Sequence, residues 1–154
     1  MATPIAAPPT PGTPSTESSI TASAPAARMR EFVGALRAIW SCWQDGTPLR
    51  FEGEFYRHTL MTPFFNPGAL ECGAPKVFLA AVGEKMTEVA GEVCDGIILH
   101  GFTTERYVRE VTIPALERGW EKAGKSRQDF QLSGPLFVVT GTTEEEVAKA
   151  RAGT

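Results

Sequence analysis

Small residues stand at three places where the chain is expected to leave a buried strand. The stretches Ala80-Ala81-Val82-Gly83, His100-Gly101-Phe102 and Thr140-Gly141-Thr142 each follow an apolar run. Small side chains let a ligand approach the backbone, and the helix that follows offers free N–H groups to an anion. Residues 80–83 therefore suit a cradle for a ring and a phosphate, although glycine in such loops also serves turn geometry alone.

His100 stands at the end of an expected strand. His58 lies in an irregular stretch and is expected to be structural or exposed. His100 suits a hydrogen bond to a cofactor or a proton donation, and equally a bond to the backbone at the rim of the core. Glu84 after the cradle would oppose a phosphate, and Lys85 would partly offset it. Two histidines without clustered carboxylates predict no metal site.

Several classes of function lack support in the sequence. No GxSxG, P-loop or GxGxxG pattern occurs, so a serine hydrolase, a nucleoside triphosphatase and the dinucleotide fingerprint are not indicated. The net charge of −3 lacks the basic footprint of a nucleic-acid binder, and no apolar run is long enough to cross a membrane. Three cysteines without a CxxC pair favour reduced thiols and a cytoplasmic location.

The elements that must position these groups follow from apolar spacing and turn residues. A helix is expected over residues 28–43, followed by an irregular insert in which residues 51–56 suggest a short extended pair or a turn. The apolar loop at 62–68, with two prolines and a glycine, is expected to pack against the rest of the domain. The 127 residues from Arg28 onward (154 − 27) are enough for one domain.

Buried strands and helices alternate from residue 76 onward. Continuous apolar runs predict strands buried on both faces at 76–82 and 97–100, and a third strand within 130–140. Helices are expected at 84–94, from Thr104, and after the capping boxes of Thr142 and Thr143. Pro114 should kink or split the second of these helices. This order is typical of βαβ crossovers, so the fold class is α/β with a parallel sheet.

Residues 1–27 differ from the remainder of the chain in composition. They contain six of the twelve prolines and a single charged residue before Arg28, Glu17. Such a Pro/Ser/Thr/Ala-rich stretch buries too little apolar surface to offset its ordering entropy. We therefore expect a disordered tail over 1–27 and one folded domain over 28–154.

Six short segments occur in an order that resembles the luciferase-like monooxygenase superfamily. They are 36–40 (LRAIW), 51–56 (FEGEFY), 75–81 (PKVFLAA), 90–96 (AGEVCDG), 114–119 (PALERG) and 123–124 (AG). The loop at 62–68 (TPFFNPG) resembles oxidoreductases of this superfamily that depend on the deazaflavin coenzyme F-420, with FMN as the alternative cofactor. The resemblance runs from about Arg28 to Arg151.

The resemblance implies a (β/α)8 TIM barrel with the cofactor at the carboxyl ends of the strands. In the family, the turn that matches Ala80, Ala81, Val82 and Gly83 supports the cofactor ring and its phosphate. His100 and Gly101, at the end of the next strand, would also face the cofactor. The family reaction implied is hydride transfer between the deazaflavin and a small organic substrate.

The matched residues cover only part of such a barrel. A whole barrel takes about 250 residues, and the matched segment supplies roughly three of its eight strands. We therefore expect the C-terminal half of the barrel, poorly stable and inactive or nearly so by itself. No residue matches the groups that the family places near the reacting carbon, so no catalytic residue is predicted. A homo-oligomer, a partner subunit that completes the barrel and a non-enzymatic α/β ligand-binding module remain alternatives.

Overall fold

The computed structural model describes residues 24–135 and 138–153. Residues 1–23, most of the predicted tail, lie outside the described residues, so the domain boundary at residue 28 stays a prediction. Helix α2 (Pro25–Asp45) begins three residues before the expected start. Proline suits the first turn of a helix, and Gly46 ends α2 in the left-handed conformation with φ of 67°.

Three short parallel strands form the sheet that carries the predicted site residues. They lie side by side in the order β3 (Phe78–Ala80), β4 (Gly96–Ile98) and β5 (Gln131–Ser133). Leu79, Ile97 and Leu132 form one row across the sheet. Each strand is shorter than the apolar run that predicted it, and the parallel α/β arrangement is confirmed.

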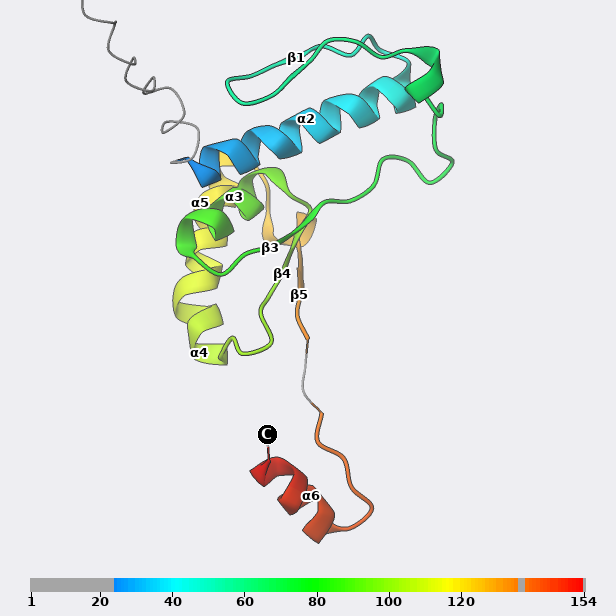
Figure 1. Cartoon of the computed structure of the whole chain (residues 1–154). Helices are drawn as coiled ribbons and strands as arrows, with labels where there is room; N and C mark the ends of the chain where they lie inside the picture. Colours follow the sequence, from blue (N-terminus) through cyan, green and yellow to red (C-terminus); the bar gives the residue numbers. More distant parts are fainter. Residues whose placement is uncertain (1–23, 136–137, 154) are drawn as a thin grey trace, which may run out of the picture.

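The helices that follow β3 and β4 cover one face of this sheet (Figure 1). They are α3 (Glu84–Val93), α4 (Glu105–Tyr107), the five-residue π-helical turn η2 (Val108–Thr112) and α5 (Ile113–Ala123). Thr104 caps α4 as expected, since its Oγ1 accepts a hydrogen bond from the N–H of Tyr107 at 3.2 Å. Pro114 stands in the first turn of α5 and has no N–H to donate, so the helix splits before it.

Helices α3 and α5 meet through their backbones. A Cβ atom added to Gly91 would lie 2.7 Å from the carbonyl oxygen of Leu116, and one added to Gly119 would lie 2.8 Å from the N atom of Glu92. Any side chain at either position would therefore force the helices apart.

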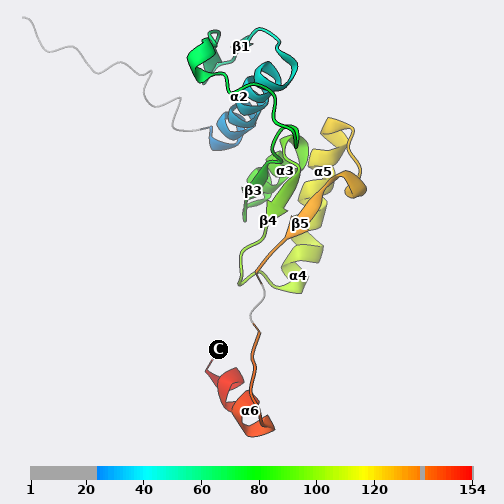
Figure 2. The same cartoon turned by 90° about the vertical axis from the view of Figure 1, so that its right-hand side faces the viewer.

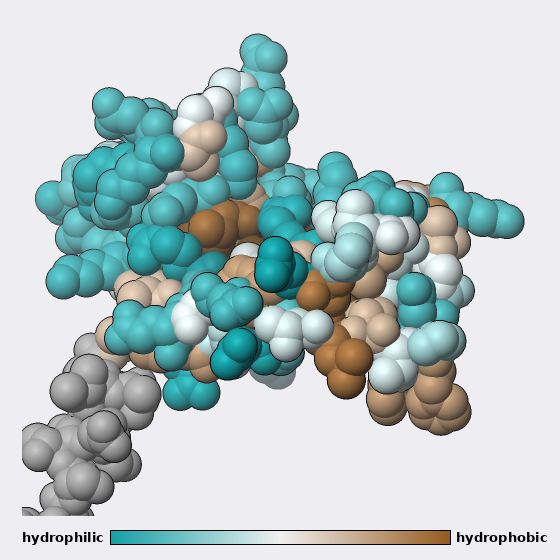
Figure 3. Space-filling model, turned by 90° about the horizontal axis from the view of Figure 1, so that it is seen from above, coloured by the Kyte–Doolittle hydropathy of each residue, from teal (hydrophilic) through white to brown (hydrophobic). Residues whose placement is uncertain are grey.

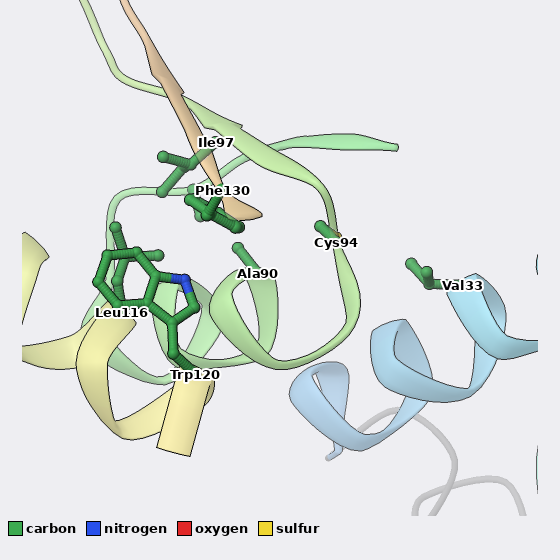
Figure 4. Close-up of a cluster of buried hydrophobic side chains, with 8 residues drawn as sticks. Val33, Ala90, Cys94, Ile97, Leu116, Trp120 and Phe130 are labelled. Carbon is green, nitrogen blue, oxygen red and sulfur yellow. The ribbon is translucent and has the colours of Figure 1, made fainter. Parts of the chain in front are cut away.

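The hydrophobic core lies between the sheet, α3 and α5, with Val33 of α2 at its edge (Figure 4). Ile97 and Leu116 are fully buried there. The rings of Trp120 and Phe130 meet edge to face, with centroids 5.4 Å apart. This core joins the strand–helix units into one body.

The other face of the sheet is open, so the expectation that its strands are buried on both faces is wrong. The row formed by Ala80, Ile98 and Ser133 faces this side, and Ile98 is 44% exposed. Helices α3 and α5, which follow β3 and β4, lie on the opposite face, as Figure 2 shows. A continuous apolar run predicts a strand but does not determine what covers each face.

The insert forms a hairpin on α2. Strands β1 (Phe51–Glu52) and β2 (Arg57–His58) pair antiparallel, so the extended pair forms, with its second strand just beyond the expected range. The carboxylate of Glu31 on α2 accepts hydrogen bonds from the backbone N–H groups of Glu54, Phe55 and Tyr56. This single side chain therefore fixes the turn of the hairpin to the helix.

The apolar loop after the hairpin does not pack as expected. Its 3-10 turn η1 (Pro63–Phe65) leaves Phe64 88% and Phe65 67% exposed. Figure 3 shows a mostly hydrophilic surface from above, with small separate hydrophobic patches. None of the described helices is long and apolar enough to span a bilayer.

Helix α6 (Glu144–Ala152) lies away from the sheet in Figures 1 and 2. Thr143 caps it by accepting a hydrogen bond from the N–H of Glu146. The Glu146 carboxylate accepts from the N–H of Thr142 rather than that of Thr143, so the predicted capping box at Thr143 forms only in part.

Candidate functional site

The turns after β3 and β4 meet at one edge of the sheet, where five of the six predicted residues line a common hollow of about 470 Å³. Because Ala80 and Ile98 are register partners, the chain leaves both strands at the same level. We name this the sheet-end hollow. Its predicted members are Ala80, Ala81, Val82, His100 and Gly101, and its other walls are Ile98, Leu99, Phe102 and Pro135.

Gly83, the sixth predicted residue, caps α3 and lines a neighbouring hollow of about 880 Å³. This helix-end hollow also contains Arg30, Glu84, Lys85 and Tyr107. Gly83 has ordinary φ and ψ of −72° and 145°, and a Cβ added to it would meet nothing within 4 Å. The space beside the N-terminus of α3 is therefore open to a ligand, and the first-turn N–H groups suit an anion.

The charges at the start of α3 oppose an anion less than the sequence suggested. The Glu84 carboxylate pairs with Arg118 at 3.1 Å. Hydrogen bonds from Lys122 and Arg118 lower the pKa of Glu88 on the next turn, although partial burial opposes this shift. Lys85 forms no ion pair with a described side chain, so its positive charge remains available to a ligand of the helix-end hollow.

Arg30, on the far side of the same hollow, is already bound. Its guanidinium makes two hydrogen bonds of 2.7 Å to the Glu92 carboxylate. This pairing raises the pKa of Arg30, against the effect of burial. Arg30 therefore fixes α2 to α3, and Lys85 is the better cation for a bound anion.

A third hollow of about 440 Å³ adjoins the other two, and we name it the side hollow. Its lining is Val82, His100, Phe102, Thr103, Thr104 and Tyr107. The Tyr107 hydroxyl donates a hydrogen bond of 3.1 Å to the carbonyl oxygen of Val82. Tyr107 therefore links the turn after β3 to the helix after β4, and it separates the side hollow from the helix-end hollow.

His100 is exposed and its ring orientation is fixed by its own turn. Its Nδ1 accepts a hydrogen bond of 3.3 Å from the N–H of Phe102, and the two rings lie 5.5 Å apart. Because Nδ1 is an acceptor, the neutral imidazole carries its proton on Nε2. His58 lies instead in the hairpin, stacked against Tyr56.

Two parts of the sequence interpretation need correction. Thr140-Gly141-Thr142 does not follow a strand end, because β5 ends at Ser133, and Gly141 and Thr142 line a separate hollow with α6. Phe102 and Tyr107 line the side hollow, and neither was among the predicted site residues. The predicted cap at Thr104 could have placed Tyr107 near the strand ends, because the cap fixes where its helix begins.

A second polar cluster lies at the opposite end of the strands and has a structural role. The Asp95 carboxylate accepts hydrogen bonds from the Val77 N–H at 2.7 Å and from Arg37 at 3.0 Å. Lys125 donates to the carbonyl oxygen of Cys94, and burial lowers the pKa of Lys125. Among the described residues, no group of three or more His, Cys, Asp or Glu side chains is placed to hold a metal ion.

The chain is similar to an uncharacterized protein and to two named enzymes, one of which is F-420-dependent. It is 53% identical over 130 residues to an uncharacterized protein of Mycobacterium tuberculosis, covering 84% of this chain and 38% of that protein. It is 35% identical to the F-420-dependent glucose-6-phosphate dehydrogenase of Mycolicibacterium gilvum, covering 77% of this chain and 33% of the relative. Identity to the 5,10-methylenetetrahydromethanopterin reductase of Archaeoglobus fulgidus is 30%, over 72% of this chain and 30% of the relative. The chain thus spans about a third of the length of these relatives.

A solved structure with the same fold is an F-420-dependent secondary alcohol dehydrogenase in complex with an F-420–acetone adduct. It superposes with a TM-score of 0.55 at 20% sequence identity, over 75% of this chain and 34% of the other. The expected part of a TIM barrel is thereby confirmed. The family model described as luciferase-like monooxygenase matches residues 11–153, beginning earlier than the expected start at Arg28. The chain belongs to the luciferase-like monooxygenase family, of the type related to coenzyme F-420-dependent oxidoreductases.

Proposed function

We propose that this chain supplies the cofactor-binding turns of an oxidoreductase that uses coenzyme F-420. The observation that carries the proposal is the meeting of two strand-end turns. Ala80, Ala81 and Val82 from one turn and His100 and Gly101 from the next line a single hollow, and Gly83 opens the adjacent helix.

The walls of the two hollows match the two chemical parts of the cofactor. The sheet-end hollow has small and apolar walls, which suit a flat ring. The helix-end hollow offers the N-terminus of α3 and Lys85, which suit a phosphate. FMN also joins a ring to a phosphate, so the residues that line the hollows accommodate either cofactor. Similarity to F-420-dependent relatives favours the deazaflavin.

In the proposed reaction, the bound deazaflavin supplies hydride transfer between its C5 atom and an organic substrate. The residues of this chain hold the ring against β3 and β4 and the phosphate against α3. Among the described residues that line the sheet-end and side hollows, His100 and Tyr107 are the ionisable ones. Tyr107 is already bonded to Val82, so it acts here by orienting the turn.

We propose that turnover also requires strands packed against the open face of the sheet. Ile98 and the row that contains it would lie inside a completed barrel. These strands could belong to another polypeptide or another part of the same protein. The 154-residue chain, purified by itself, is therefore expected to bind cofactor with little or no turnover.

Fluorescence titration with coenzyme F-420 and with FMN tests the binding proposal. The chain should bind F-420 saturably and FMN more weakly. Ala80→Phe fills the sheet-end hollow from an exposed position, and it should abolish F-420 binding. Gln131→Phe, on the same face at the opposite end of the strands, is the matched control and should leave binding unchanged. If Ala80→Phe and Gln131→Phe bind F-420 equally well, the ring does not lie in this hollow.

A further inference from the structure

The side hollow offers apolar surface without charge. Among the described residues that line it, none carries a charge at neutral pH when His100 is neutral. Val82 is 56% exposed and Phe102 is 79% exposed, so both present apolar surface that a ligand could cover. Such walls favour an apolar molecule and penalise an unpaired ionic group.

The polar atoms around this hollow leave the hydroxyls of Thr103 and Thr104 and one ring N–H, that of His100, to a ligand. The Tyr107 hydroxyl donates to the Val82 carbonyl, and the Thr104 hydroxyl oxygen accepts from the Tyr107 N–H. The His100 Nδ1 accepts from the Phe102 N–H, which leaves the Nε2–H of the neutral ring. No described residue accepts a hydrogen bond from this Nε2–H, so it is available to an oxygen atom of a ligand.

The cations nearest along the chain are already paired. Arg106 pairs with Glu110 at 2.9 Å and Arg109 pairs with Glu105 at 2.7 Å, both one helical turn apart. A phosphate in the side hollow would have to share such an arginine with its carboxylate partner. Lys85 lines the helix-end hollow, on the other side of Tyr107.

We infer that the side hollow takes the substrate of the proposed oxidoreductase, and that this substrate is an uncharged, mainly apolar molecule with a carbonyl or hydroxyl oxygen. That oxygen accepts a hydrogen bond from the His100 Nε2–H. The inference rests on the proposed function. It makes phosphorylated compounds poor ligands of this hollow, although a phosphate of the cofactor fits the helix-end hollow.

Two probes with the same ring and different charge test this inference. Cyclohexanone and cyclohexyl phosphate are titrated separately into the isotope-labelled full chain with F-420 present, and amide NMR shifts are followed. Cyclohexanone should give saturable shifts centred on residues 100–103, with cyclohexyl phosphate about tenfold weaker or more at the same residues. Equal or tighter binding of the phosphate there, or no saturable shift with cyclohexanone, overturns the inference.

Two variants separate the roles of charge and hydrogen bonding. Thr103→Lys adds a cation to the wall while the turn keeps the backbone hydrogen bond from residue 103 to His100, so it should raise the affinity for cyclohexyl phosphate. His100→Phe removes the donor and should weaken cyclohexanone about fivefold. His58→Phe, the matched change in the hairpin, should alter neither ligand. If His100→Phe and His58→Phe behave alike, His100 does not hold the oxygen.

Fluorescence titration of F-420 in the same samples keeps this inference separate from the proposed function. F-420 binding together with a preference for cyclohexyl phosphate refutes the substrate class and leaves the cofactor proposal standing. Cyclohexanone binding without F-420 binding refutes the cofactor proposal and, with it, the substrate role of the side hollow.

Discussion

Replacing Gly83 with aspartate should strengthen helix α3 and weaken cofactor binding at the same time. Gly83 is the N-cap residue, it has extended φ and ψ, and no side chain presently caps the helix. An added Cβ meets nothing within 4 Å, so the fold accepts the change. An aspartate there can accept a hydrogen bond from the first-turn N–H groups and interacts favourably with the helix dipole. Together these effects should add about 0.5 to 1 kcal/mol to the free energy of unfolding.

The same carboxylate would stand where we place the cofactor phosphate. Two like charges about 4 Å apart repel by about 1 kcal/mol in water and by about 4 kcal/mol at the effective dielectric near a protein surface. Since about 1.4 kcal/mol corresponds to a tenfold change in affinity, Gly83→Asp should weaken F-420 binding about tenfold or more. Added salt should reduce the difference by screening the charges.

Gly83→Asn is the matched control, because asparagine has nearly the same shape and caps a helix about as well without a charge. Thermal unfolding of the apo chain and fluorescence titration of F-420 at low and high salt give the two readouts. Both variants should unfold at or above the wild-type temperature, and only the aspartate should lose affinity. Equal F-420 affinities of the two variants at low salt would refute the placement of the phosphate at α3.

Three further predictions concern polar groups and a thiol of the described fold. Asp95→Ala should lower the free energy of unfolding by about 2 to 3 kcal/mol, because the Val77 N–H and Arg37 lose their acceptor. Urea unfolding measures this loss. A loss no greater than that of the exposed control Asp45→Ala contradicts the prediction. Burial raises the pKa of the Cys94 thiol to about 11, so at about pH 8 iodoacetamide should modify exposed Cys72 quickly and Cys94 only after unfolding. Equal rates of modification at the two thiols in the folded chain would contradict the burial of Cys94. The hydrogen bond from Lys122 lowers the pKa of Glu88, so this carboxylate stabilises the fold above its ordinary pKa of 4.5, and that contribution is lost as the pH falls through the lower folded value. Thermal unfolding as a function of pH should show a shallower acid decline for Glu88→Gln than for the wild type, and identical profiles would show that the pair contributes nothing.

The alternation of strands and helices could be predicted because each strand is a short apolar run that ends in small residues. The meeting of residues 80–82 with His100 and Gly101 also followed, since neighbouring parallel strands end at the same edge of a sheet. Burial on both faces was wrong because a run such as Ile97–Ile98 does not reveal that helices cover only the side of Ile97.

Other errors came from competing local signals. Gly134-Pro135 marks the end of the third strand, but the apolar residues after it suggested that the strand continued toward Thr140. Tyr107 bonds to Val82 across 25 positions of the chain. That contact depends on how α4 and the π-helical turn approach the sheet, which residue spacing alone does not determine.

The close backbone contact between α3 and α5 bears on how relatives of this chain could acquire new ligands. Gly91 and Gly119 have no room for a side chain, so change at these positions is strongly restricted. Helices α3 and α5 follow strands β3 and β4, whose ends form the hollows. Because the distance between the two helices is fixed, the distance between the two strand ends is fixed as well. Val82 and Phe102 are exposed beyond that contact and support no part of it. A library of variants at Val82 and Phe102 would therefore sample new ligand preferences in folded proteins, whereas a library at the two glycines would consist mainly of misfolded chains.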